Sequence, residues 1–63
     1  MGEKEFGVMK TYKSNRPERY FRIGKALIKI EFVNGLYHTD NPLFQKAIEN
    51  SEAFRAGEIT IMQ

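Results

Sequence analysis

Cysteine and tryptophan are absent from the 63 residues, and histidine occurs once, as His38. The lack of cysteine excludes disulfide bonds and zinc sites built on thiolates, and one histidine cannot form a histidine-rich metal site. A chain this short buries only about 60% of the surface that its unfolded form exposes. Small domains without disulfides or metals are commonly stabilised by other subunits. The sequence therefore predicts a protein that associates with a partner or with further copies of itself.

Long hydrophobic runs are also missing, since no stretch approaches the roughly 20 apolar residues that cross a bilayer. The first residues, MGEKEFGVMK, carry acidic side chains where a signal peptide has a basic and then an apolar stretch. Phe6 occupies the position where a myristoylation signal has Ser or Thr. We expect no membrane partner and a protein made and used in a cytoplasm.

The residue patterns of common catalytic sites are lacking. Glycines occur singly, at positions 2, 7, 24, 35 and 57, so there is no glycine-rich loop to bind phosphate. The single aspartate, Asp40, lies beside a predicted helix start, where a carboxylate is stabilised by the helix dipole. His38 is expected to face solvent opposite Glu31. We expect no enzymatic activity, no cofactor, no metal and no small-molecule substrate.

The hydrophobic pattern predicts a single small domain over residues 1–63. A content of 41% hydrophobic and 13% aromatic residues is typical of a folded chain. Alternation of apolar and polar residues predicts strands over 6–12, 19–23, 26–33 and 58–62. Residues 13–18, KSNRPE, are a loop by composition. An alternative for residues 1–18 is an extended arm or loop.

The most readable unit is a hairpin around Asn34-Gly35. These two residues favour the positive φ angles of a two-residue type I′ turn. The loop length sets a register in which Val33 faces Leu36, Phe32 faces Tyr37 and Glu31 faces His38. The second strand is expected to end near Thr39. Gly24-Lys25 predicts another tight turn, between the strands 19–23 and 26–33.

A helix is predicted from Pro42 to about Asn50, because Asn41 is a good N-cap and proline fits the first helical position. Its apolar stripe consists of Leu43, Phe44, Ala47 and Ile48. Ser51 is expected to cap a short further turn that carries Phe54, and Gly57 to end that turn. The predicted fold class is α+β: an antiparallel meander of three to four strands packed on one main helix, with a closing C-terminal strand.

Charge is distributed unevenly along the chain. Residues 10–29 hold seven basic residues and one acid, whereas residues 31–63 hold five acids and two bases. Aromatic residues alternate with the basic ones, as they do on surfaces that bind nucleic acid or protein. The candidate partner-binding residues are Lys10, Tyr12, Lys13, Arg16, Arg19, Tyr20, Arg22 and Lys25.

Residues 32–61, FVNGLYHTDNPLFQKAIENSEAFRAGEITI, resemble short structural proteins from the head region of tailed phages and prophages. The shared features are an F-x-N-G-x-Y-x-T hairpin, an Asp/Asn/Pro helix start, an apolar-striped helix and a closing F-x-x-G-x-I segment. They are carried here by Phe32, Asn34, Gly35, Tyr37, Thr39, Asp40, Pro42, Ile48, Phe54, Gly57 and Ile59. The resemblance implies a virion structural or assembly part, and it covers none of the basic region.

Three interpretations follow. The first is a non-enzymatic capsid-associated, decoration or head-completion protein, present in many symmetric copies in the virion and in the host cytoplasm during assembly. Its basic, aromatic amino-terminal half would bind capsid or neck proteins or neighbouring copies of itself in a homo-oligomer. The second is a small basic accessory protein that binds nucleic acid, whose affinity would fall steeply with salt. The third, an inhibitor of a host protein, fits the size and charge of the chain without any residue selecting it.

Overall fold

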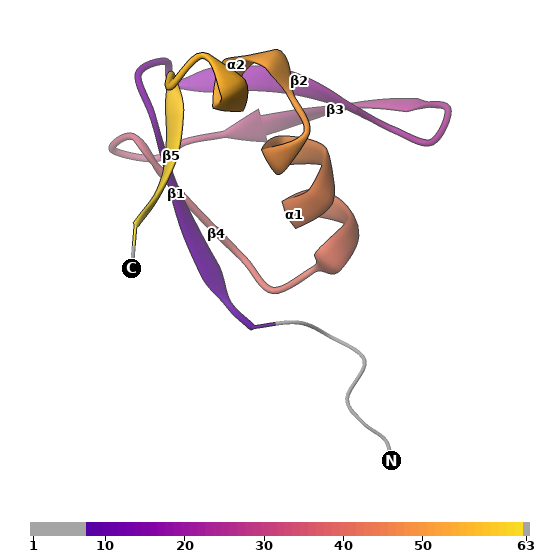
Figure 1. Ribbon diagram of the computed structural model, residues 1–63, viewed down its shortest axis with the longest axis horizontal. Coiled ribbons are helices and arrows are strands. Elements are labelled where there is room, and N and C mark those ends of the chain that lie inside the picture. The colour runs from indigo at the N-terminus through magenta and orange to yellow at the C-terminus, as the bar shows by residue number, and fades with distance from the viewer. Residues whose placement is uncertain (1–7, 63) are drawn as a thin grey trace.

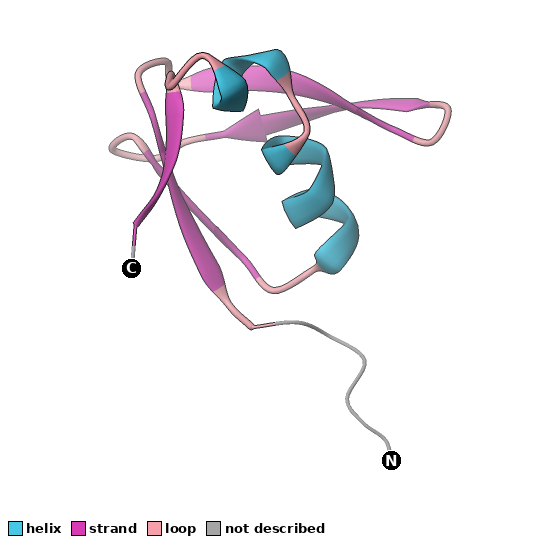
Figure 2. Cartoon of the chain, viewed as in Figure 1, coloured by secondary structure: helices cyan, strands magenta, loops and turns pink. Residues whose placement is uncertain are grey.

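The computed structural model describes residues 8–62, which form two small antiparallel sheets and two short helices (Figures 1 and 2). In chain order the elements are β1 (Lys10–Ser14), β2 (Glu18–Ile23), β3 (Ala26–Glu31), β4 (Leu36–Thr39), α1 (Pro42–Glu49), α2 (Glu52–Arg55) and β5 (Ile59–Met62). β2 and β3 pair with each other, while β1 lies between β4 and β5. The α+β class and the closing C-terminal strand are confirmed.

β2 and β3 form a regular hairpin that ends in the predicted Gly24-Lys25 turn. Gly24 has a φ of +62°, the left-handed conformation that glycine adopts without strain. Ile23 is paired with Ala26, and the register continues to Glu18 opposite Glu31. Because successive side chains point to opposite sides of a strand, Phe21 and Ile30 are buried on the inner side.

β1 is the central strand of the second sheet. Tyr12 is paired with Tyr37 of β4 on one side and with Ile61 of β5 on the other. The predicted first strand is thus confirmed over residues 10–12, and it extends through Lys13 and Ser14, which composition had assigned to a loop. The alternative of an extended arm is wrong for residues 10–14. Phe6 and Gly7 of the predicted strand lie outside the described residues.

The Asn34-Gly35 turn has the predicted conformation but a different role. Asn34 and Gly35 have φ angles of +57° and +82°, and a bridge joins Val33 to Leu36. The pairing ends there, so the predicted meander is wrong. The backbone N–H of Phe32 donates to the Pro17 carbonyl at 2.7 Å, which keeps this end of β3 beside β2 and not beside β4. The turn therefore makes a corner between the two sheets.

The corner also changes the predicted partners of the β4 side chains. Phe32 and Tyr37 do meet, edge to face with ring centroids 6.0 Å apart, although β3 and β4 share no ladder. The expected Glu31–His38 pair is wrong. His38 lies opposite Thr11 of β1 instead, and its Nδ1 is 2.8 Å from the Thr11 hydroxyl.

Two short helices replace the predicted single main helix. α1 starts as predicted, with the Asn41 side chain accepting a hydrogen bond from the Leu43 N–H at 2.9 Å. Ser51 caps α2 by accepting from the Phe54 N–H at 3.2 Å. Leu43 was expected on the buried stripe of α1, yet 61% of it is exposed. The buried residues of α1 are instead Gln45 and Ile48, and the Gln45 side chain donates to the Thr39 carbonyl at 2.8 Å.

The core lies where the sheets and α1 converge, and α1 occupies the angle between the hairpin and β4 (Figure 1). It is built from both sheets and the helix, and its buried hydrophobic members are Tyr12, Phe21, Ile30, Phe32, Ile48 and Ile59. Burying one large aliphatic side chain contributes about 1.5–3 kcal/mol. Tyr12 is fully buried, so the central strand is anchored by an aromatic residue of the basic region.

Candidate interaction surface

The outer side of the β2–β3 hairpin carries an exposed group of aromatic, aliphatic and cationic side chains. We call this group the hairpin face, and it consists of Tyr20, Arg22, Lys25, Leu27 and Lys29. Tyr20 lies opposite Lys29, and Arg22 lies opposite Leu27, so these four share one side of the two strands. Lys25 lies in the turn. Tyr20 and Leu27 are 58% and 60% exposed, respectively, which is high for large hydrophobic residues.

Leu27 and Lys29 were not among the predicted partner-binding residues. The sequence did contain a signal for them, because in the run ALIKIE Leu27 and Lys29 alternate with Ile28 and Ile30, so the two pairs point to opposite sides of the strand. A strand that buries Ile30 must direct Leu27 outward. Beside the exposed Tyr20 and Arg22, Leu27 adds apolar area to the hairpin face, and contiguous apolar surface can mark an interaction site.

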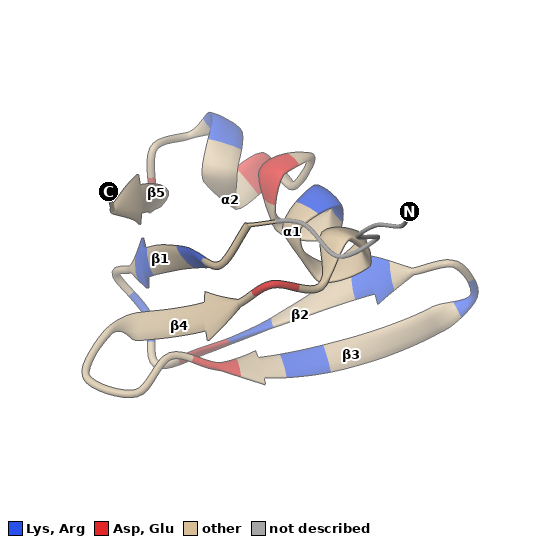
Figure 3. Ribbon diagram, turned by 90° about the horizontal axis from the view of Figure 1, so that it is seen from below, with Lys and Arg blue, Asp and Glu red and all other residues tan. Residues whose placement is uncertain are grey.

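The charges of the hairpin face differ between its two ends. Near the corner of the fold, the Lys29 ammonium lies 3.4 Å from Glu18 and 3.5 Å from Glu31. Glu18, and secondarily Glu31, raise the pKa of Lys29, so this lysine is charged and locally neutralised. At the turn end, neither Arg22 nor Lys25 forms an ion pair within residues 8–62. The unneutralised positive charge of the face thus gathers toward the turn (Figure 3).

Arg19 was predicted to bind a partner, but it holds the fold together. Its side chain is only 11% exposed, and its guanidinium lies 2.9 Å from the Glu58 carboxylate. The same group donates to the Ser14 hydroxyl at 2.8 Å and to the Asn15 side chain. Arg19 therefore joins the hairpin to the end of β1 and to the start of β5, and little of its side chain is exposed for a partner.

Tyr12 and Lys10 are also used internally, because both contact Glu49 at the end of α1. The Tyr12 hydroxyl donates to a Glu49 carboxylate oxygen at 2.5 Å, and the Lys10 ammonium donates to the same oxygen at 2.9 Å. The bond from Tyr12, and then the one from Lys10, lower the pKa of Glu49. Burial and the nearby carboxylate raise the pKa of Tyr12. Tyr12 was also predicted to bind a partner, but its side chain is fully buried and offers a partner no contact surface.

The two remaining predicted residues are exposed but differ in position. Lys13 lies on β1, where it is paired with Leu36 and Thr60, so the structure does not bring it onto the hairpin. Arg16, in the loop before β2, borders the same surface hollow as Tyr20. The structure therefore brings together Tyr20, Arg22 and Lys25, with Arg16 at one side.

Other kinds of site receive little support from the described residues. Within residues 8–62, no group of three or more His, Asp or Glu side chains could hold a metal ion. The Thr11–His38 contact is an exposed polar pair between neighbouring strands, which commonly contributes to sheet stability. Neither of the described helices has the length and apolar character needed to cross a membrane.

Comparison of the chain with protein-family models, with curated proteins and with solved structures finds no match. The resemblance of residues 32–61 to phage head-region proteins therefore stays a prediction.

Proposed function

We propose that this chain is a non-enzymatic assembly protein of a tailed phage or prophage, which docks on a larger structural protein of the particle through the hairpin face. The observation that carries the proposal is the exposure of Tyr20, Leu27 and Arg22 together on one side of β2–β3. Tyrosine and arginine are enriched among the residues that dominate binding energy. Two unneutralised cations at the turn end favour an acidic partner surface.

The charges of the rest of the chain support a protein partner. Lys10 and Arg19 are neutralised by Glu49 and Glu58, so the basic run of the sequence does not form one continuous cationic surface. Nucleic-acid binding without sequence preference needs such a surface along the phosphate backbone. The residues left for a partner form a small face that mixes hydrophobic and cationic groups, as in the central part of protein–protein interfaces.

Charge reversal at the turn end of the face tests the proposal. We expect the double variant Arg22→Glu/Lys25→Glu to lose association with particles from the strain that encodes the chain, because two attractive contacts become repulsive. Both residues are exposed and unpaired within residues 8–62, so the melting temperature should stay within a few degrees of that of the unchanged protein. The measurement is the fraction of protein that co-sediments with purified particles.

A matched control is Lys13→Glu/Arg55→Glu, which makes the same change of charge away from the hairpin and should still co-sediment. Retention of Arg22→Glu/Lys25→Glu on particles contradicts the proposed docking face. A parallel measurement uses a short DNA duplex. Salt-sensitive binding of the unchanged protein to DNA, lost in the double variant, would instead assign the face to nucleic acid.

A further inference from the structure

The outer edge of β2 is an unpaired strand edge within the described part of the chain. Hydrogen-bonded and non-hydrogen-bonded positions alternate along an antiparallel pair. Because Pro17 accepts from the Phe32 N–H, the odd-numbered residues of β2 bond to β3. The backbone N–H and C=O groups of Glu18, Tyr20 and Arg22 must then point away from β3. These outward backbone groups form no backbone hydrogen bond within residues 8–62.

We propose that this edge pairs with the same edge of a second copy, in an antiparallel arrangement with its two-fold axis at Tyr20. Tyr20 then lies opposite Tyr20 of the other copy, and Glu18 lies opposite Arg22. The outward backbone groups of all three residues meet partners, which joins two hairpins into a four-stranded sheet. Opposite charges at directly facing positions stabilise a strand pair, and by symmetry this pair occurs twice.

Other pairings of the hairpin edges are less favourable in charge. Along β3, the outward backbone groups belong to Leu27, Lys29 and Glu31, so the equivalent arrangement places Lys29 opposite Lys29 of the other copy. Like charges at facing positions are destabilising. If the two-fold axis lies at Phe21 of β2 and not at Tyr20, Glu18 lies opposite Gly24 of the other copy and neither ion pair forms. Among these arrangements, only the β2 edge with its two-fold axis at Tyr20 places opposite charges of ERYFRI opposite each other.

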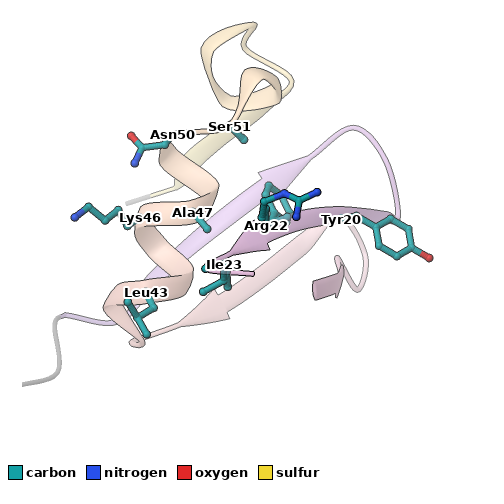
Figure 4. A pocket seen from close by; sticks show the side chains of 10 residues that line it. Tyr20, Arg22, Ile23, Leu43, Lys46, Ala47, Asn50 and Ser51 are labelled. Atoms are coloured by element: carbon teal, nitrogen blue, oxygen red, sulfur yellow. The ribbon is translucent and has the colours of Figure 1, made fainter. Parts of the chain in front are cut away.

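The surroundings of β2 leave room for a second strand. A hollow of about 430 Å³ lies between β2 and α1, and another of about 380 Å³ lies between the start of β2 and the residues around Ser51. Figure 4 shows Tyr20 pointing away from α1, while Ile23 and Ala47 face the space between strand and helix. The edge is therefore bordered by the helices without being hydrogen-bonded to them.

This pairing goes beyond the proposed docking function and does not depend on it. It meets the need of a domain this small for added stabilisation, and it places Tyr20, Lys25 and Leu27 of two copies on one continuous sheet, while Arg22 of each copy is paired with Glu18 of the other. Docking and pairing can also fail separately. Glu18→Arg removes the pairing but leaves every cation of the hairpin face in place.

The test is sedimentation velocity of the whole chain over a wide range of concentration, up to the millimolar. We expect the unchanged protein to form dimers, and Glu18→Arg or Arg22→Glu alone to weaken dimerisation by roughly tenfold or more, since each places like charges opposite each other twice. The double swap Glu18→Arg/Arg22→Glu restores opposite charges and should restore dimerisation. Tyr20→Pro, which removes an outward N–H, should abolish it, whereas Leu27→Pro, at the β3 edge, should not.

Circular dichroism of each variant shows whether the monomer is folded, and only folded variants are compared. A monomeric unchanged protein at every concentration overturns the inference. Dimerisation that survives Glu18→Arg, Arg22→Glu and Tyr20→Pro overturns it as well, because the contact then lies elsewhere. A folded double swap that stays monomeric contradicts the register at Tyr20.

Discussion

Replacement of Asn34-Gly35 by Val-Val is expected to remove a large part of the stability of this domain. Both residues have positive φ angles, of +57° and +82°. The left-handed conformation costs an ordinary residue roughly 1–2 kcal/mol, and β-branched side chains tolerate it least. The two replacements together should cost about 2–4 kcal/mol. A domain of this size has a free energy of unfolding of only about 3–9 kcal/mol.

The cost is high also because the turn forms the corner of the fold. The Gly35 carbonyl accepts a hydrogen bond from the Ser14 N–H at 2.9 Å, which ties the turn to β1. A change in the turn thus disturbs β1 as well as β4. Thermal unfolding followed by circular dichroism measures the effect. Asn34→Asp is the control, since aspartate also tolerates this conformation, and a melting temperature unchanged by Val-Val refutes the assigned turn.

Arg19→Glu is expected to destabilise the fold by about 3 kcal/mol, since it removes the ion pair and hydrogen bonds of a largely buried arginine and places two carboxylates side by side. The Arg19 side chain is 11% exposed and contacts Glu58 and the Ser14 hydroxyl. Glu58 is 42% exposed, so solvent screens part of the new repulsion. The expected loss in the free energy of unfolding therefore lies at the lower end of the range for broken buried ion pairs.

The free energy of unfolding in urea measures this loss. Arg16→Glu is the matched control, because Arg16 is exposed and three residues earlier in the chain; its change should stay within about 0.5 kcal/mol. If Arg19→Glu unfolds at the same urea concentration as the unchanged protein, the structural role of Arg19 is wrong. That result would return Arg19 to the residues available for a partner.

Features coded by a few neighbouring residues could be predicted from the sequence. Asn34-Gly35 and Gly24-Lys25 form the turns that their φ preferences favour, and Asn41 and Ser51 cap helices as expected. In each case the relevant hydrogen bond or backbone angle involves residues close in the chain. Local chemistry was sufficient there.

Pairings between distant residues could not be predicted in the same way. β1 pairs with β4 and β5, whereas the sequence pattern favoured a continuous meander through the Asn34-Gly35 turn. Nothing near Phe32 indicates that its N–H bonds to Pro17 instead of extending the hairpin. Strand register across long separations depends on the packing of the whole core.

The same difference between local features and distant contacts applies to the candidate site. Basic residues were grouped by their nearness in sequence, but Lys10 and Arg19 contact Glu49 and Glu58, both 39 positions away. Tyr12 was interpreted as a surface aromatic because its neighbours are charged, and burial in a central strand overrides that composition. The alternation of side chains along a strand predicted exposure better than composition did, since it identifies Leu27 as outward-facing.

The most direct test of the docking face is site-specific photo-cross-linking. A benzophenone amino acid replaces Leu27, which is on the hairpin face but not on the β2 edge, or Thr60, an exposed residue of β5. Each variant is mixed with purified particles, irradiated and analysed by mass spectrometry. We expect cross-links to a particle protein from position 27 and none from position 60. Cross-links from position 60 alone would contradict this expectation.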